Sequence, residues 1–179
     1  GRQIARLRVV NTTQGIEVIS FDKSTGPWSV EDGTLQSALQ SFVDTHRLDE
    51  DSVYTILPRH DITSRILTLP TQDAAEIAQM MKLSAAEYVP YPPEELIIDQ
   101  SILETLPSGE AKVMVVLAHQ DVVHGHVEIL QGVGIRPEEV LLSSACLASV
   151  GMKSDLDEGV PVALIDLASG GIEVLVLEG

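Results

Sequence analysis

The first sixty residues switch between strand-like and helix-like spacing of apolar positions. Residues 4–10 alternate apolar residues with two arginines, which predicts a half-exposed strand. Turn-forming residues separate this strand from a second one over 16–21, so the pair predicts a hairpin. After a loop over 22–33, apolar residues recur at helical spacing over 34–46. A short apolar strand over 53–57 completes this part.

The middle of the chain predicts a different unit. The expected order is strand, helix, strand, strand, helix, over residues 64–69, 71–88, 96–103, 111–119 and 121–131. The first of these helices carries one apolar stripe that ends at Tyr88, and the proline-rich segment 89–93 stops it. Thr71 is the expected N-cap of that helix.

The last forty residues return to short apolar segments. A strand over 139–142 and a short helix over 145–150 precede two strands, over 161–167 and 172–177, that flank the small-residue turn 168–171. The sequence has no internal repeat and no long Gly/Ser/Pro linker. We therefore expect contiguous subdomains rather than tethered ones.

Charge narrows the set of partners. The 179 residues have a formal net charge of -16, and residues 94–179 alone carry 15 acids against 3 bases. Binding nucleic acid requires clustered Lys and Arg, so the sequence predicts no nucleic-acid partner.

The longest apolar run, 113–118, is far too short to span a membrane. The single cysteine, Cys146, lies in an apolar stretch and is interpreted as a core residue rather than a reactive thiol.

Two clusters of polar residues contain metal-binding side chain types. His124 and His126 are two positions apart in a predicted helix, so they point about 200° away from each other and cannot converge with His119 on one ion. These histidines are interpreted as exposed polar positions. The acidic run 49–51 lacks the glycine and the closing glutamate of a calcium loop and is interpreted as a solvated charge run. The sequence therefore predicts no metal site.

The final hairpin contains a candidate phosphate loop. Asp166 precedes a turn with Ser169, Gly170 and Gly171, and such small residues let backbone N–H groups approach a phosphate while a nearby carboxylate holds magnesium through water. The alternative is an ordinary hairpin turn, because Gly-Gly commonly closes hairpins.

Several strings in the middle of the chain carry a family resemblance. They are a strand ending in Leu-Pro at 64–70, a helix ending in Tyr-Val-Pro-Tyr-Pro within 85–92, and a strand with an internal acid at 95–103. In this order they resemble the PilM family of type IV pilus assembly proteins, and also the cytoplasmic domain of the L protein of type II secretion. Both are actin-like proteins related to the cell-division protein FtsA.

The resemblance implies an α/β fold. The chain is expected to be the first lobe of an actin-like (ribonuclease-H-like) fold with an inserted SHS2-type α+β subdomain. Residues 1–63 and 138–179 would form the ribonuclease-H-like part, and 64–137 the insert. The second actin-like lobe is expected to be absent.

The resemblance also implies a function. The expected role is that of a cytoplasmic scaffold that is recruited to the inner membrane of a pilus or secretion platform by the cytoplasmic tail of a PilN-like or secretion-platform membrane protein. An assembly ATPase is a further implied partner. The tail would bind in a groove beside the insert, near Tyr88, Tyr91 and Leu96; the alternative is that these three side chains only pack in the core.

The rival interpretation is that the chain binds a nucleotide at the candidate phosphate loop. Ala168 stands where the related phosphate loop has glycine, and Ile172 where threonine is frequent. The sequence therefore predicts no cofactor and no enzymatic activity. The alternatives are an actin-like enzyme that binds ATP with magnesium, and a stand-alone SHS2-type binding module.

Overall fold

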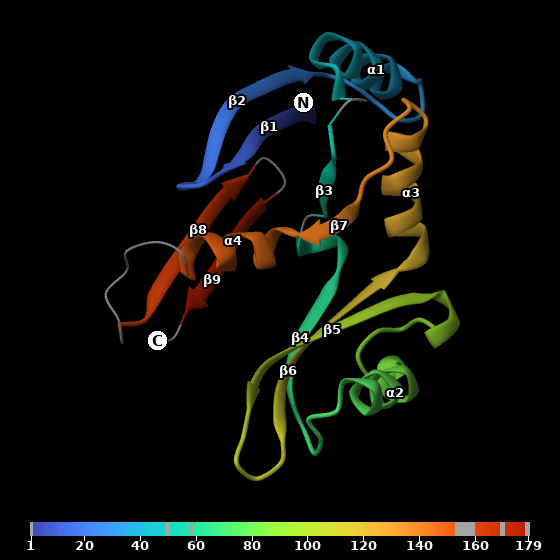
Figure 1. Cartoon of the computed structure of the whole chain (residues 1–179). Helices are drawn as coiled ribbons and strands as arrows, with labels where there is room; N and C mark the ends of the chain where they lie inside the picture. The colour runs from blue at the N-terminus through green and yellow to red at the C-terminus, as the bar shows by residue number, and fades with distance from the viewer. Residues whose placement is uncertain (1, 49–50, 58, 153–159, 169–170, 178–179) are drawn as a thin grey trace. The chain divides into compact units, whose positions relative to one another are not determined.

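The chain folds into two compact units. The structure, a computed structural model, describes residues 2–48, 51–57, 59–152, 160–168 and 171–177 (Figure 1). Unit 1 contains Gly1–Val53 and Glu128–Glu138, and unit 2 contains Tyr54–Val127 and Glu139–Gly179. These boundaries differ from the predicted subdomains 1–63 with 138–179, and 64–137. That division stays a prediction.

Unit 1 begins with a long antiparallel hairpin. Strand β1 (Arg2–Thr12) pairs with β2 (Gly15–Gly26), with a bulge between Arg8 and Val9. The hairpin was predicted, but residues 22–26 were wrongly assigned to a loop. They are strand because β1 begins at Arg2 and still offers them pairing partners.

The two faces of this hairpin have opposite character. The polar face is the better buried one. On this face, the guanidinium of Arg6 forms an ion pair with Asp22 at 3.0 Å and donates to the His46 carbonyl at 2.8 Å. On the other face, Leu7 and Phe21 are directly opposite each other and more than half exposed. Arg6 thus ties the hairpin to the end of helix α1.

Helix α1 (Thr34–His46) lies where the sequence predicted it. The helix begins after Gly33, whose φ of 72° lies in the left-handed region that glycine adopts readily. The Asp32 carboxylate accepts hydrogen bonds from the backbone N–H and the hydroxyl of Thr34. Its apolar stripe forms the core of unit 1 with two residues that follow helix α3 (Gln120–Gln131); the buried members are Leu39, Val43, Val133 and Ile135.

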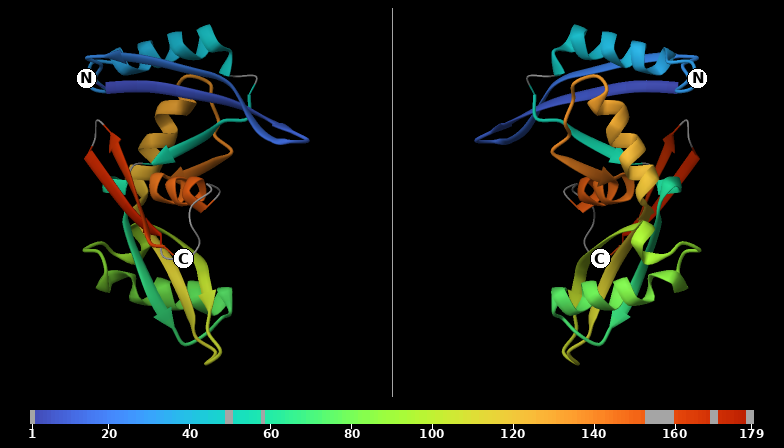
Figure 2. Two further views of the ribbon diagram at one scale, coloured as in Figure 1. Left: turned by 90° about the vertical axis from the view of Figure 1, so that its left-hand side faces the viewer. Right: turned by 90° about the vertical axis from the view of Figure 1, so that its right-hand side faces the viewer.

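Unit 2 contains an antiparallel sheet covered by a helix. Its strands β4 (Thr63–Leu69), β5 (Leu96–Thr105) and β6 (Ala111–His119) have the order β4-β6-β5, and helix α2 (Ala74–Ser84) lies on one face (Figures 1 and 2). The predicted order of elements over 64–137 is therefore found. That this unit is of the SHS2 type stays a prediction.

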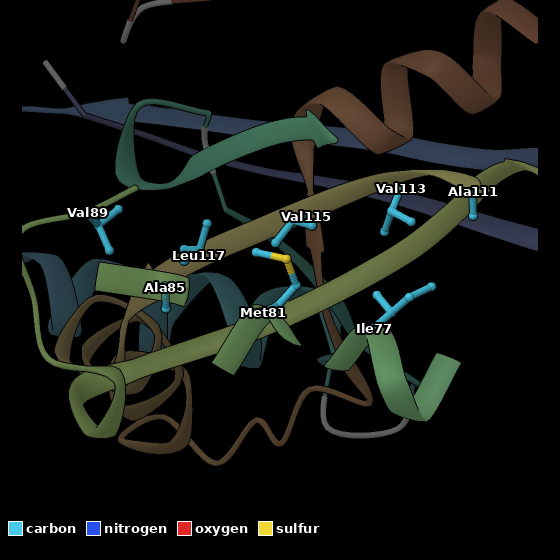
Figure 3. Close-up of a cluster of buried hydrophobic side chains, with 8 residues drawn as sticks. All are labelled: Ile77, Met81, Ala85, Val89, Ala111, Val113, Val115 and Leu117. Atoms are coloured by element: carbon cyan, nitrogen blue, oxygen red, sulfur yellow. The ribbon is translucent and has the colours of Figure 1, made fainter. Parts of the chain in front are cut away.

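The core of unit 2 lies between α2 and the central strand. Side chains at helical spacing on α2 point toward alternate side chains of β6 (Figure 3). The buried members are Ile77, Met81, Ala85, Val89, Ala111, Val113, Val115 and Leu117. The predicted apolar stripe was Ala74, Ile77, Met81, Ala85 and Tyr88. Its three middle members are buried, whereas Tyr88 is half-buried and Ala74 is exposed.

Both ends of α2 differ from the prediction. The N-cap is Asp73, not Thr71: its carboxylate accepts from the backbone N–H groups of Ala75 and Glu76, each at 2.9 Å. Thr71 instead donates to the Glu76 carboxylate at 2.6 Å. The helix ends at Ser84, and a 3-10 turn, η3 (Ala85–Glu87), continues toward the prolines.

The remaining elements of unit 2 are short. Strand β3 (Tyr54–Leu57) pairs in parallel with β7 (Glu139–Leu142), and helix α4 (Ser143–Met152) follows β7 directly. Strands β8 (Val162–Ala168) and β9 (Gly171–Leu177) form an antiparallel hairpin. All these strands were predicted to within about two residues.

Candidate functional site

The candidate phosphate loop is described only in part. Ser169 and Gly170 lie outside the described residues, and Gly171 begins β9 opposite Ala168. Asp166 is exposed and lies directly opposite Glu173 on the neighbouring strand. Two facing carboxylates repel a phosphate and destabilise the strand pair when both are charged.

Among the described residues, no basic side chain pairs with Asp166 or with Glu173 opposite it. Glu173 accepts a hydrogen bond from the Ser143 hydroxyl at 2.7 Å, at the start of α4. Phosphate binding here would require a cation to neutralise the two acids.

The three candidate peptide-binding residues have different environments. Tyr88 and Leu96 are half-buried and pack against the core cluster of unit 2. Tyr91 is 44% exposed. Among these three residues, Tyr91 is therefore the side chain best placed to contact a partner.

Tyr91 belongs to a polar cluster that joins three elements. Its ring lies edge-on to His119 at a centroid distance of 4.9 Å. His119 Nδ1 lies 3.2 Å from the backbone nitrogen of Asp121, which donates to it, and Nε2 lies 3.4 Å from the Glu95 carboxylate. His119 was predicted to be an exposed polar position, but it is half-buried. Its contact with Tyr91 was not predicted, because no local pattern links residues 28 positions apart.

A free sheet edge starts beside this cluster. Among the described residues, β5 pairs with β6 alone, so its outer edge has no strand partner; the backbone N–H of Gln100 on this strand donates to the Asp99 carboxylate. The edge begins at Leu96, which is directly opposite His119. We name Tyr91, Glu95, His119 and the outer edge of β5 the Tyr91 site.

His126 is not the exposed polar position that the sequence predicted. It is half-buried, and its Nε2 lies 2.6 Å from the Thr55 hydroxyl. Burial lowers the pKa of His126, and the charge of Asp61 opposes this effect. His124 on the same helix is exposed, as expected.

The environment of the cysteine disfavours a reactive thiol. Cys146 is half-buried, and burial raises the pKa of its thiol, which disfavours a reactive thiolate. No group of three metal-binding side chains occurs in the parts of the chain that the structure describes. Of the helices described, none is both long and apolar enough to cross a membrane.

Two of the shallow depressions formed by described residues of unit 1 lie beside α1. The larger, about 780 Å³, is lined by polar side chains of that helix. The smaller, about 400 Å³, lies between Lys23, Trp28 and Phe42. Trp28 folds over Gly26, where a Cβ would lie 2.5 Å from the indole. Neither depression contains a residue of the two predicted sites.

Comparisons identify the fold. No protein-family model and no curated protein matches the sequence. A chain of the PilM-PilN type IV pilus biogenesis complex matches the structure with a TM-score of 0.79 at 19% identity, over 99% of this chain and 55% of that one. The cytoplasmic domain of EpsL, an inner membrane component of the type II secretion system of Vibrio cholerae, matches with a TM-score of 0.62 at 15% identity, over 99% and 66%.

The resemblance predicted from the sequence is thus confirmed at the level of the fold. The chain has the mixed α/β fold of components of a pilus biogenesis complex and a type II secretion system. It spans about half the length of the pilus chain and about two thirds of the EpsL domain.

Proposed function

We propose that this chain is a cytoplasmic scaffold of an inner-membrane assembly platform, of the type IV pilus or type II secretion kind. The observation that carries the proposal is the fold match over 99% of the chain to components of both systems. The scaffold would dock on the cytoplasmic tail of a bitopic membrane protein related to PilN, and this contact would bring it to the inner membrane. Catalysis is not part of the proposed role.

The Tyr91 site is the proposed docking surface. An extended tail can add to a sheet edge through backbone hydrogen bonds, while nearby pockets select its side chains. The outer edge of β5 offers those backbone groups, and Tyr91 supplies a half-exposed aromatic surface at its start. Tyr88 and Leu96 contribute indirectly, because they hold the segment against the core.

Charge at this surface indicates the chemistry of the tail. Glu94 and Glu95 lie in the 3-10 turn η4 (Pro93–Glu95), and Asp99 is exposed on β5. A tail with Lys or Arg beside its apolar anchors would therefore associate faster, and added salt would weaken this effect.

A pull-down tests the proposal. Cytoplasmic tails of candidate bitopic proteins are immobilised and exposed to the purified chain at low salt. We expect one class of tail to retain the wild-type chain and to lose most of the Tyr91→Ala variant. Leu83→Ala, which removes a 79%-exposed side chain of α2 in the same unit, is the matched control and should bind like wild type. Failure of every tail to retain the wild-type chain would contradict the proposal.

A further inference from the structure

The imidazole of His119 lies between two carboxylates of unit 2. Its Nε2 is 3.4 Å from the Glu95 carboxylate, and its Nδ1 is 3.6 Å from the Asp121 carboxylate. The His119 side chain is only 22% exposed, whereas those of Glu95 and Asp121 are 52% and 90% exposed. Each contact is an ion pair only when the imidazole is protonated. The strength of both contacts therefore depends on the charge of His119.

A backbone hydrogen bond distinguishes the two charge states of His119. The N–H of Asp121 donates to His119 Nδ1 at 3.2 Å. A ring nitrogen accepts only while it carries no proton, and an imidazolium carries protons on both nitrogens. A proton that Nδ1 takes from solvent therefore removes this acceptor and makes Nδ1 a donor, which the Asp121 carboxylate can accept. His119 thus has one hydrogen-bonding arrangement for each charge state.

The groups packed around His119 let it change its contacts without moving the backbone. The titratable groups that face the ring are the two acids and Tyr91, which lies edge-on to it, while Leu96 is opposite it on β5. The Gln120 side chain donates to the Glu94 carbonyl and so ties the start of α3 to η4. Because neither group of that bond titrates, η4 stays in place when His119 gains or loses a proton.

We propose that His119 makes docking at the Tyr91 site depend on pH, because its imidazolium competes with the tail for the Glu95 carboxylate. This inference rests on the proposed function, in which a Lys or Arg of the tail is attracted by acids at this site. When His119 is neutral, Glu95 can pair with the cation of the tail. Protonation places a positive charge 3.4 Å from the same carboxylate and changes the ring against which Tyr91 lies.

The competition fixes the direction of the effect. Histidine changes its charge between about pH 8 and pH 5.5, whereas Asp and Glu ordinarily stay charged over this range. Tail binding should therefore weaken as the pH falls from 8 to 5.5. The loss should be about threefold to fivefold in affinity, which is the size of one exposed ion pair. By linkage, a bound tail favours the neutral state of His119.

The affinity of tail peptides at two pH values tests the competition. Acetylated synthetic peptides of candidate bitopic tails, chosen without histidine, are titrated into the purified chain by calorimetry at about pH 8 and pH 5.5. The wild-type chain should bind about threefold to fivefold more weakly at the lower pH. His119→Asn, which cannot become charged, should bind equally at both. Glu95→Gln should bind more weakly than wild type at pH 8 and should also lose the pH dependence. His124→Gln, an exposed histidine of α3, is the control and should keep it.

NMR spectra of the chain without peptide test the rearrangement by itself. In the wild type, the amide signal of Asp121 and the ring signals of Tyr91 should shift together with the ring signals of His119 between about pH 8 and pH 5.5. The same two sets of signals should stay nearly fixed in His119→Asn. In His124→Gln they should shift as in wild type.

The two experiments separate the failure of regulation from the failure of docking. Binding that does not change with pH, or an equal pH dependence in wild type and His119→Asn, would overturn the role of His119 while leaving the docking site intact. An Asp121 amide signal that ignores the His119 titration would overturn it as well. Absence of peptide binding at both pH values would overturn docking and its regulation together. Should His119→Asn not fold by circular dichroism, an undiminished pH dependence in Glu95→Gln contradicts the proposal instead.

Discussion

Met81 shows how much one side chain contributes to unit 2. It is 1% exposed and lies between α2 and the central strand β6 (Figure 3). Met81→Ala should lower the free energy of unfolding by about 2–5 kcal/mol, because it removes buried methylenes and leaves a cavity. Urea denaturation measures the change. Leu83→Ala on the exposed side of the same helix should stay within about 0.5 kcal/mol of wild type, and equal losses in the two variants would contradict the assigned core.

His126 makes stability depend on pH. Its pKa in the folded chain is lowered from the ordinary value of 6.5 by burial, so the unfolded chain binds the proton more readily. The contribution of His126 is therefore complete above pH 6.5 and is lost as the pH falls from there toward the folded pKa. His126→Gln should flatten the decline in unfolding free energy between about pH 7 and pH 5. His124→Gln, at an exposed position, should leave the decline unchanged; identical slopes in both variants would refute the assignment.

At the scale of elements, Asp73 determines where α2 begins. Its carboxylate accepts from two backbone N–H groups that no helical carbonyl can satisfy. Asp73→Ala should cost about 1 kcal/mol of unfolding free energy. Gln79→Ala on the exposed middle of the same helix should be nearly neutral, because both residues favour helix. A thermal melt in which the two variants coincide would show that Asp73 is not the cap.

Most elements could be predicted because their periodicity is local. The helix over 34–46 and the strand over 111–119 are found at the predicted residues. The end of β2 was misplaced because pairing with Arg2 and its neighbours, not local turn chemistry, keeps residues 22–26 extended. The cap of α2 was assigned to Thr71 because threonine and aspartate are both good caps, and only the backbone geometry selects between them.

The candidate sites were less predictable than the elements. Local sequence marks Tyr88, Tyr91 and Leu96 alike as apolar residues near a helix end. The contact with His119 separates Tyr91 from the other two, and it depends on how β6 returns beside β5. His126 was likewise misjudged: it is half-buried, and its partner Thr55 lies on a strand 71 positions earlier in the chain.

For the whole molecule, we expect no nucleotide binding. The described part of the candidate phosphate loop places Asp166 opposite Glu173, and electrostatic stabilisation of a phosphate needs donors and cations arranged together. Titration calorimetry with ATP and magnesium should give no binding heat. A micromolar affinity that Asp166→Ala abolishes would contradict this expectation and favour the actin-like enzyme.

The affinity of the chain for a cytoplasmic tail tests the scaffold proposal most directly. Synthetic peptides of the tails of candidate bitopic membrane proteins are titrated into the purified chain by calorimetry, at low and at high salt. The account predicts saturable binding of one peptide per chain, weakened by salt and by Tyr91→Ala but not by Leu83→Ala. If no tail peptide gives a saturable heat at low salt, or if the Tyr91 and Leu83 variants bind equally, the proposed docking at the Tyr91 site is wrong.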